Sequence, residues 1–168
     1  VEDQTRRLME VCRMRDTPVI VFINKMDRDG KNRFDLLEEI EKELNIHLHP
    51  MTWPINSGKD FKGVYDLHNK SLVLFTANTK ANEEDVVNIN DLSDAVLDEK
   101  IGDADAKILR EDVELVEGVY GALNTNDYLK AKVAPVFFGS AVNNFGVKEL
   151  LETFVRISPT PQSRETSV

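Results

Sequence analysis

The segment that most constrains the fold is a run of five apolar residues at positions 19–23, which follows Pro18 and ends at Asn24-Lys25-Met26-Asp27. The run is too short for an ordinary helix or a membrane span, and most of its residues are β-branched. Such runs are typical of strands buried on both faces in the middle of a parallel α/β sheet. Because open α/β sheets bind ligands at the carboxyl ends of their strands, we expect residues 24–27 to lie at a binding site.

A second apolar strand is predicted at 133–139, and it ends at Ser140-Ala141. Helical periodicity predicts further elements at 1–15 and 34–44, and a last helix that carries Val147, Leu150, Leu151, Phe154 and Ile157. Strands that alternate with helices indicate an α/β fold class with a parallel sheet. We expect residues 1–55 and 133–160 to form this main domain, followed by a linker at 161–168.

The segment between the two parts, residues 56–132, is predicted to be an α+β insert. Short strands are expected at 63–67, 71–75 and 86–89, joined by turns at 68–70 and 76–85. A short helix that ends near residue 101 and a longer helix at 103–123 follow. Before the insert, alternating apolar residues predict strand structure at 46–55, interrupted by Pro50. His47 and His49 share one face there, and we interpret them as solvent-facing rather than as metal ligands with His68.

Composition limits the function classes. The 168 residues suit one domain, or one domain with an insertion, and the formal net charge of −9 argues against binding to DNA or to anionic membranes. The single cysteine, Cys12, fits a reducing compartment, and no apolar run is long enough to span a membrane. We therefore expect a cytoplasmic protein, and nothing in the sequence indicates a homo-oligomer.

The two polar strand ends have the residue types of the guanine-reading motifs of GTPases. Guanine presents N1–H and N2–H as adjacent donors, and the Asp27 carboxylate can accept both. Adenine would leave that carboxylate unpaired, and a site of this kind can reject the wrong ligand by about 10⁴.

The neighbouring residues have expected roles as well. Asn24 can hold the loop by bonding nearby backbone, the Lys25 stem can cover the base, and the Met26 side chain should point inward. The Ala141 N–H can donate to guanine O6, and the Ser140 hydroxyl can support Asp27.

The phosphate-binding motif of a GTPase is absent from the sequence. That motif needs Gly-x4-Gly-Lys-Ser/Thr, and Ser57-Gly58-Lys59-Asp60 fails because Asp60 stands where Ser or Thr must bind Mg²⁺. No catalytic residue and no metal ligand can be assigned. A dinucleotide-binding domain is also excluded, since the sequence has no Gly-x-Gly-x-x-Gly.

Segments along nearly the whole chain resemble the bacterial peptide chain release factor 3 family: residues 1–6, 24–29, 52–55, 61–65, 135–141, 144–147 and 159–166. The resemblance implies part of a P-loop-GTPase-type sheet in three α/β/α layers, in a translational GTPase related to elongation factor G. It implies that Asn24, Lys25 and Asp27 read guanine, with Ser140 and Ala141 on the far side. The parent protein would bind GTP and GDP with Mg²⁺, and would help to remove codon-reading release factors from the ribosome.

The family's phosphate loop, switch segments and β-barrel domains have no counterpart in these residues. We therefore expect the chain alone to be inactive, although the parent protein would hydrolyse GTP. Two alternatives remain open: part of an elongation-factor-G-type translocation GTPase, and an acidic protein-interaction module that binds no nucleotide.

Overall fold

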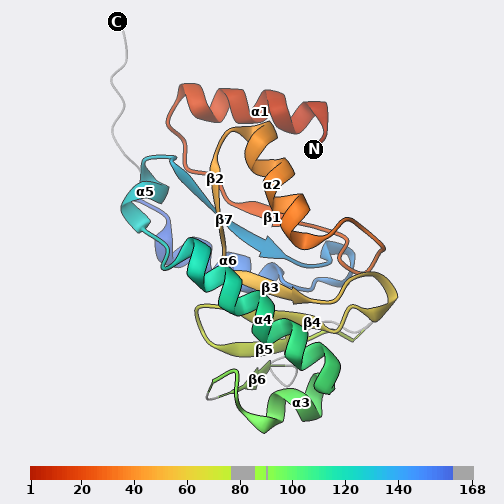
Figure 1. The fold of residues 1–168 in the computed structure, drawn as a ribbon. Coiled ribbons are helices and arrows are strands. Elements are labelled where there is room, and N and C mark those ends of the chain that lie inside the picture. The colour runs from red at the N-terminus through yellow and green to blue at the C-terminus, as the bar shows by residue number, and fades with distance from the viewer. Residues whose placement is uncertain (77–85, 90, 161–168) are drawn as a thin grey trace, which may run out of the picture.

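The computed structural model describes residues 1–76, 86–89 and 91–160, and its strands form two sheets (Figure 1). The first sheet is parallel and has the order β1-β7-β2, with β1 at Val21–Ile23, β7 at Val133–Phe138 and β2 at His47–Pro50. The second is antiparallel, in the order β3-β4-β5-β6, with bounds Thr52–Ile55, Gly63–Asp66, Ser71–Leu74 and Val86–Asn88. The predicted α/β class with a GTPase-type parallel sheet and an insert is confirmed.

The middle strand of the parallel sheet is β7, so the predicted central position of the segment 19–23 is wrong. Within the described residues, β1 pairs only with β7 and lies at the edge of the sheet. Val21 and Phe22 are accordingly half-buried, whereas β7 is buried from Ala134 to its end. An apolar run identifies a strand but does not give its place in the sheet, because the neighbours decide that.

The two sheets are joined where the chain passes from β2 to β3. The Met51 N–H donates to the Val136 carbonyl at 2.8 Å, and the Thr52 hydroxyl accepts from the Phe138 N–H at 3.1 Å. The antiparallel strands confirm those predicted near 63–67, 71–75 and 86–89, while most of the predicted turn at 76–85 lies outside the described residues. The division into a main domain and an insert at 56–132 stays a prediction.

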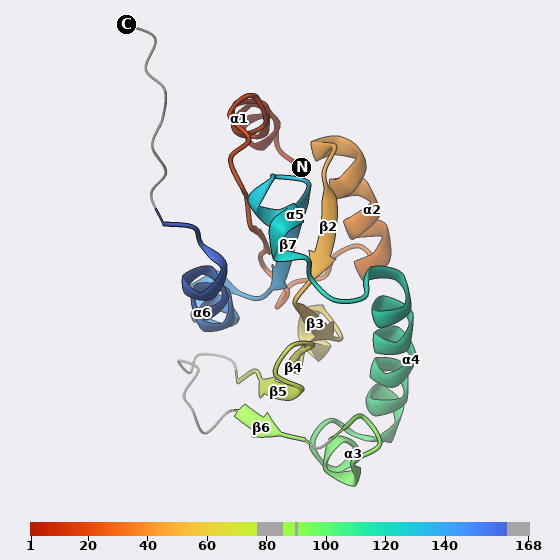
Figure 2. The ribbon, with the colours of Figure 1, turned by 90° about the vertical axis from the view of Figure 1, so that its left-hand side faces the viewer.

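Helices cover both sides of the parallel sheet. Their bounds are α1 Asp3–Met14, α2 Arg33–Leu44, α3 Ala95–Ile101, α4 Asp103–Tyr120, α5 Thr125–Leu129 and α6 Val147–Ile157. Figure 2 shows α6 on one side and α2 and α4 on the other. Side-chain caps begin several of them: Asn32 accepts from the Phe34 N–H at the start of α2, and Asp94 accepts from the Val96 N–H at the start of α3.

The long helix predicted at 103–123 is shorter in the structure. It ends at Tyr120, because Gly121 has a φ of 61° and leaves helical geometry. A further short helix, α5, was not predicted. The Asn124 side chain accepts from the Asn126 and Asp127 N–H groups and so caps the start of this helix.

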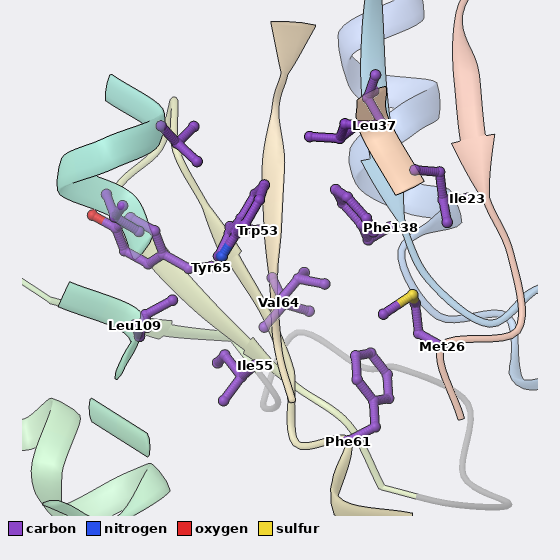
Figure 3. Close-up of a cluster of buried hydrophobic side chains, with 14 of the residues drawn as sticks. Ile23, Met26, Leu37, Trp53, Ile55, Phe61, Val64, Tyr65, Leu109 and Phe138 are labelled. Atoms are coloured by element: carbon purple, nitrogen blue, oxygen red, sulfur yellow. The ribbon is translucent and has the colours of Figure 1, made fainter. Parts of the chain in front are cut away.

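One core spans both sheets (Figure 3). Trp53 of β3 is fully buried at its centre, with its ring 4.8 Å from that of Phe34 and 5.7 Å from that of Phe138. Its indole N–H donates to Asp112 of α4 at 2.9 Å, which satisfies the one polar group of the side chain. This packing keeps the sheets in a fixed relation to each other.

His49 lies against this core rather than in solvent, so the solvent-facing interpretation is wrong for that residue. Only 9% of it is exposed, and its ring makes an edge contact with Tyr120 of α4 at 6.3 Å between centroids. His47, two residues earlier, is exposed as expected. The strand therefore turns His49 toward α4 at the point where Tyr120 covers it.

Candidate functional site

The two polar segments identified in the sequence meet at one edge of the parallel sheet. Strands β1 and β7 end side by side, with Ile23 paired to Phe138. The Gly139 N–H donates to the Ile23 carbonyl at 3.0 Å, and the Met26 N–H donates to the Gly139 carbonyl at 3.1 Å. Residues 24–27 and 139–141 are therefore one bonded structure, although more than a hundred residues separate them in the sequence.

Asn24 fastens this structure through its side chain. Its Oδ1 accepts from the Ala141 N–H at 2.9 Å and from the Lys25 N–H at 2.8 Å. The bridging role predicted for Asn24 thus has matching geometry. The Ala141 N–H, expected to donate to guanine O6, is bonded to Asn24 in this structure, so such a donation requires Asn24 to share or release it.

The side chains of residues 25–27 differ in burial. Lys25 has a left-handed backbone with a φ of 68° and an exposed side chain. Met26 is 7% exposed and points into the core (Figure 3), in the inward direction predicted for it. Asp27 is half-buried, and among the described residues no hydrogen bond or ion pair engages its carboxylate. The loop thus presents one unpaired anionic group on a fixed backbone.

Ser140 is held in place by Asn143 and Phe145. It is 1% exposed, and its hydroxyl accepts from the Asn143 side-chain amide at 2.8 Å. Its backbone forms a two-bond bridge with Phe145, at 3.1 and 3.0 Å. Within the described ranges Ser140 bonds Asn143 and Phe145 and not Asp27, so the support predicted for Asp27 is not seen as a direct bond.

Two residues that sequence reasoning did not assign complete this side of the site. Phe145 is 2% exposed and closes the turn that holds Ser140. Gly139 lies so close to it that a Cβ on this glycine would be 2.3 Å from the Phe145 carbonyl oxygen. The bridge between Ser140 and Phe145 thus closes a turn directly after β7.

The described residues contain no group of three or more His, Cys, Asp or Glu side chains that could hold a metal ion. In the same ranges, no helix is both long and apolar enough to cross a membrane. The arrangement at the sheet edge offers hydrogen-bond acceptors and donors.

Comparison with known proteins identifies the family of this chain. The model of the elongation factor Tu GTP binding domain matches residues 1–160. The chain belongs to this family. It is accordingly a guanine-nucleotide-binding domain of the translational GTPase type, and the expected nucleotide, GTP or GDP, follows from the family.

A crystal structure of a protein from Thermus thermophilus has a similar fold, with a TM-score of 0.62 and 20% sequence identity. The similarity covers 95% of this chain and 25% of that protein, so the chain spans about a quarter of its length. At this level of identity the likeness establishes the fold alone.

Proposed function

We propose that this chain is the base-reading part of the GTP-binding domain of a longer translational GTPase of the release factor 3 type. That protein would act at the ribosome in the cytoplasm and remove codon-reading release factors after termination. The observation that carries the proposal is the half-buried, unpartnered Asp27 carboxylate, held on a loop that is bonded to residues 139–141 in the described part of the chain. The sequence segments shared with the release factor 3 family support this type over a translocation GTPase.

The residues present fit a guanine base. Asp27 would accept from the two adjacent donors of guanine, and its lack of a partner among the described residues leaves both carboxylate oxygens available. Lys25 is exposed beside it, so its stem can cover one face of the base. Because Asn24 and Gly139 fix the loop before ligand binding, little further ordering of the backbone is needed when the base enters.

The phosphates and Mg²⁺ would be held elsewhere in the longer protein. In GTPases a Ser or Thr of the phosphate-binding loop binds Mg²⁺, and the sequence carries no such loop. Phosphate and Mg²⁺ contacts supply the positioning that phosphoryl transfer needs. The 168-residue chain by itself should therefore bind GTP weakly and hydrolyse none.

The test uses Asp27→Asn in the full-length GTPase that contains this chain. The amide offers a donor where xanthine has an oxygen, so nucleotide preference should change from guanine to xanthine by about 10²–10⁴. Release of a bound codon-reading release factor from terminated ribosomes is measured with GTP and with XTP. The exposed Asp35→Asn, at the start of α2, serves as the control and should still require GTP.

Unchanged GTP preference in Asp27→Asn would remove Asp27 from its proposed role. If the wild-type protein drives translocation and leaves release factors bound, the family assignment stands but the release factor 3 type does not.

A further inference from the structure

The turn that follows β3 contacts the backbone of residues 24–27. The Gly58 N–H donates to the Met26 carbonyl at 2.9 Å. Gly58 begins a 3₁₀ turn, Gly58–Asp60, and belongs to neither of the two base-reading segments. Met26 is thereby bonded on both sides, to Gly139 through its N–H and to Gly58 through its carbonyl.

The approach at this point requires glycine. Gly58 has a φ of 66°, and a Cβ there would lie 2.0 Å from Asp29 Oδ1 and 3.3 Å from the Asp29 backbone nitrogen. A side chain at residue 58 would therefore push on the chain two residues after Asp27. Among the described residues, no other glycine of the antiparallel region has this contact with the loop.

The same turn also reaches the second base-reading segment. The Phe61 N–H donates to the Gly58 carbonyl at 3.3 Å, so the two residues belong to one turn. The Phe61 ring lies 5.6 Å from that of Phe145 and 5.1 Å from that of Phe75, and Phe75 lies 5.3 Å from Phe145. Phe145 in turn makes the backbone bridge that holds Ser140.

We propose that the turn at residues 58–61 is a positioning element for guanine recognition, in which Gly58 sets the loop at 24–27 and Phe61 sets the turn at 140–145. This inference rests on the proposed function, because it assigns the turn to the same base. Met26 and Phe61 belong to the same cluster of buried hydrophobic side chains (Figure 3). A shift of this one turn would move both sides of the base site together.

The test compares Gly58→Ala with Gly121→Ala. Gly121 also has a positive φ, 61°, but nothing within 4 Å of its Cβ position, so the control places a side chain on a positive-φ backbone without the contact to Asp29. In the ligand-free 168-residue chain, amide hydrogen exchange is measured at Met26 and Ala141. In the full-length GTPase, the ratio of GDP to IDP affinity is measured, since inosine lacks the amino group that Asp27 reads.

We expect Gly58→Ala to speed amide exchange at both positions and to lower the GDP/IDP ratio about tenfold, as the loss of one aligned hydrogen bond would. Gly121→Ala should change neither. The double variant Asp29→Ala/Gly58→Ala should recover part of the ratio, because it removes the side chain that the new Cβ meets.

An unchanged ratio and unchanged exchange in Gly58→Ala would overturn this inference, as would an equal loss in Gly121→Ala. If the wild-type protein shows no preference for GDP over ADP, the proposed function fails instead. The exchange of Met26 and Ala141 then still decides whether the turn holds both segments.

Discussion

Helices α4 and α6 lie on opposite sides of the molecule (Figure 2). They differ in the residues that they bury, which are apolar on α4 and mostly polar on α6. Helix α4 turns an apolar stripe inward, and none of the four residues in it is more than 2% exposed: Ala106, Leu109, Val113 and Val116. Helix α6 buries Glu149, Thr153 and Ile157, while Leu151, Phe154 and Val155 are 54%, 49% and 79% exposed. Both helices are amphipathic, but only α4 uses its apolar face for the core.

The difference shows what an amphipathic pattern determines. Spacing at helical period predicts that a helix forms, and a core-facing apolar stripe is the usual consequence. The side that becomes buried depends on a partner surface, and α4 has one in Trp53 and the antiparallel sheet. On α6, Leu151, Phe154 and Val155 are exposed, so these apolar residues have no such partner surface in the described part of the chain.

The largest expected effect is on the stability of α4. Leu109→Ala should lower the free energy of unfolding by about 2–5 kcal/mol, because it leaves a cavity beside residues that cannot close it. Leu151→Ala on α6 removes the same atoms from a half-exposed site and should change stability by about 0.5 kcal/mol or less. Urea denaturation of both variants measures the two values. Equal losses would mean that α6 packs its apolar face as tightly as α4 does.

A smaller effect is expected at Glu149, the carboxylate that α6 buries. Burial raises the pKa of Glu149 above its ordinary value of 4.5, and the nearby Asp66 carboxylate raises it further. The folded chain therefore holds this proton to higher pH than the unfolded chain, so stability falls as pH rises from 4.5 through the folded pKa. The cost remains at neutral pH.

Glu149→Gln should remove that cost, raise the free energy of unfolding at pH 7 by about 1 kcal/mol, and flatten its dependence on acid pH. Glu152→Gln, exposed one turn away on the same helix, is the matched control and should leave the slope unchanged. A loss of stability in Glu149→Gln would show that the carboxylate has a favourable partner.

Most of the fold could be predicted from local pattern. The apolar strands, the antiparallel strands and the positions of α2 and α4 follow from periodicity and turn residues, which act within a few residues of each other. The order β1-β7-β2 could not be predicted, since it depends on contacts between segments far apart in the sequence. For the same reason, the burial of His49 under Tyr120 has no local signal.

The candidate site was also only partly predictable from the sequence. The residue types at 24–27 and 140–141 predicted the proposed base-reading segments, because the chemistry of guanine limits what can bind it. The bond from Asn24 to Ala141 and the contact of Gly58 with Met26 required the folded chain. In the sequence, Gly58 belongs to a segment that fails to match the phosphate-binding motif. The structure explains the glycine differently, because residue 58 has a left-handed backbone where it contacts the loop.

The smallest expected effect is at His49, which packs against α4. Its contribution to stability should depend on pH with the opposite sign to that of Glu149 on α6. Burial lowers the pKa of His49 below its ordinary value of 6.5, so the unfolded chain takes up this proton first as the pH falls. Stability contributed by neutral His49 is present above pH 6.5 and is lost progressively below it, which is opposite in direction to the effect of Glu149.

His49→Gln should flatten the slope of unfolding free energy between about pH 7 and pH 5, measured by urea denaturation. His47→Gln, at the exposed position on the same strand, is the control and should leave that slope as it is in the wild-type chain. A slope that persists in His49→Gln would place the acid sensitivity elsewhere and would show that protonated His49 is tolerated beneath Tyr120.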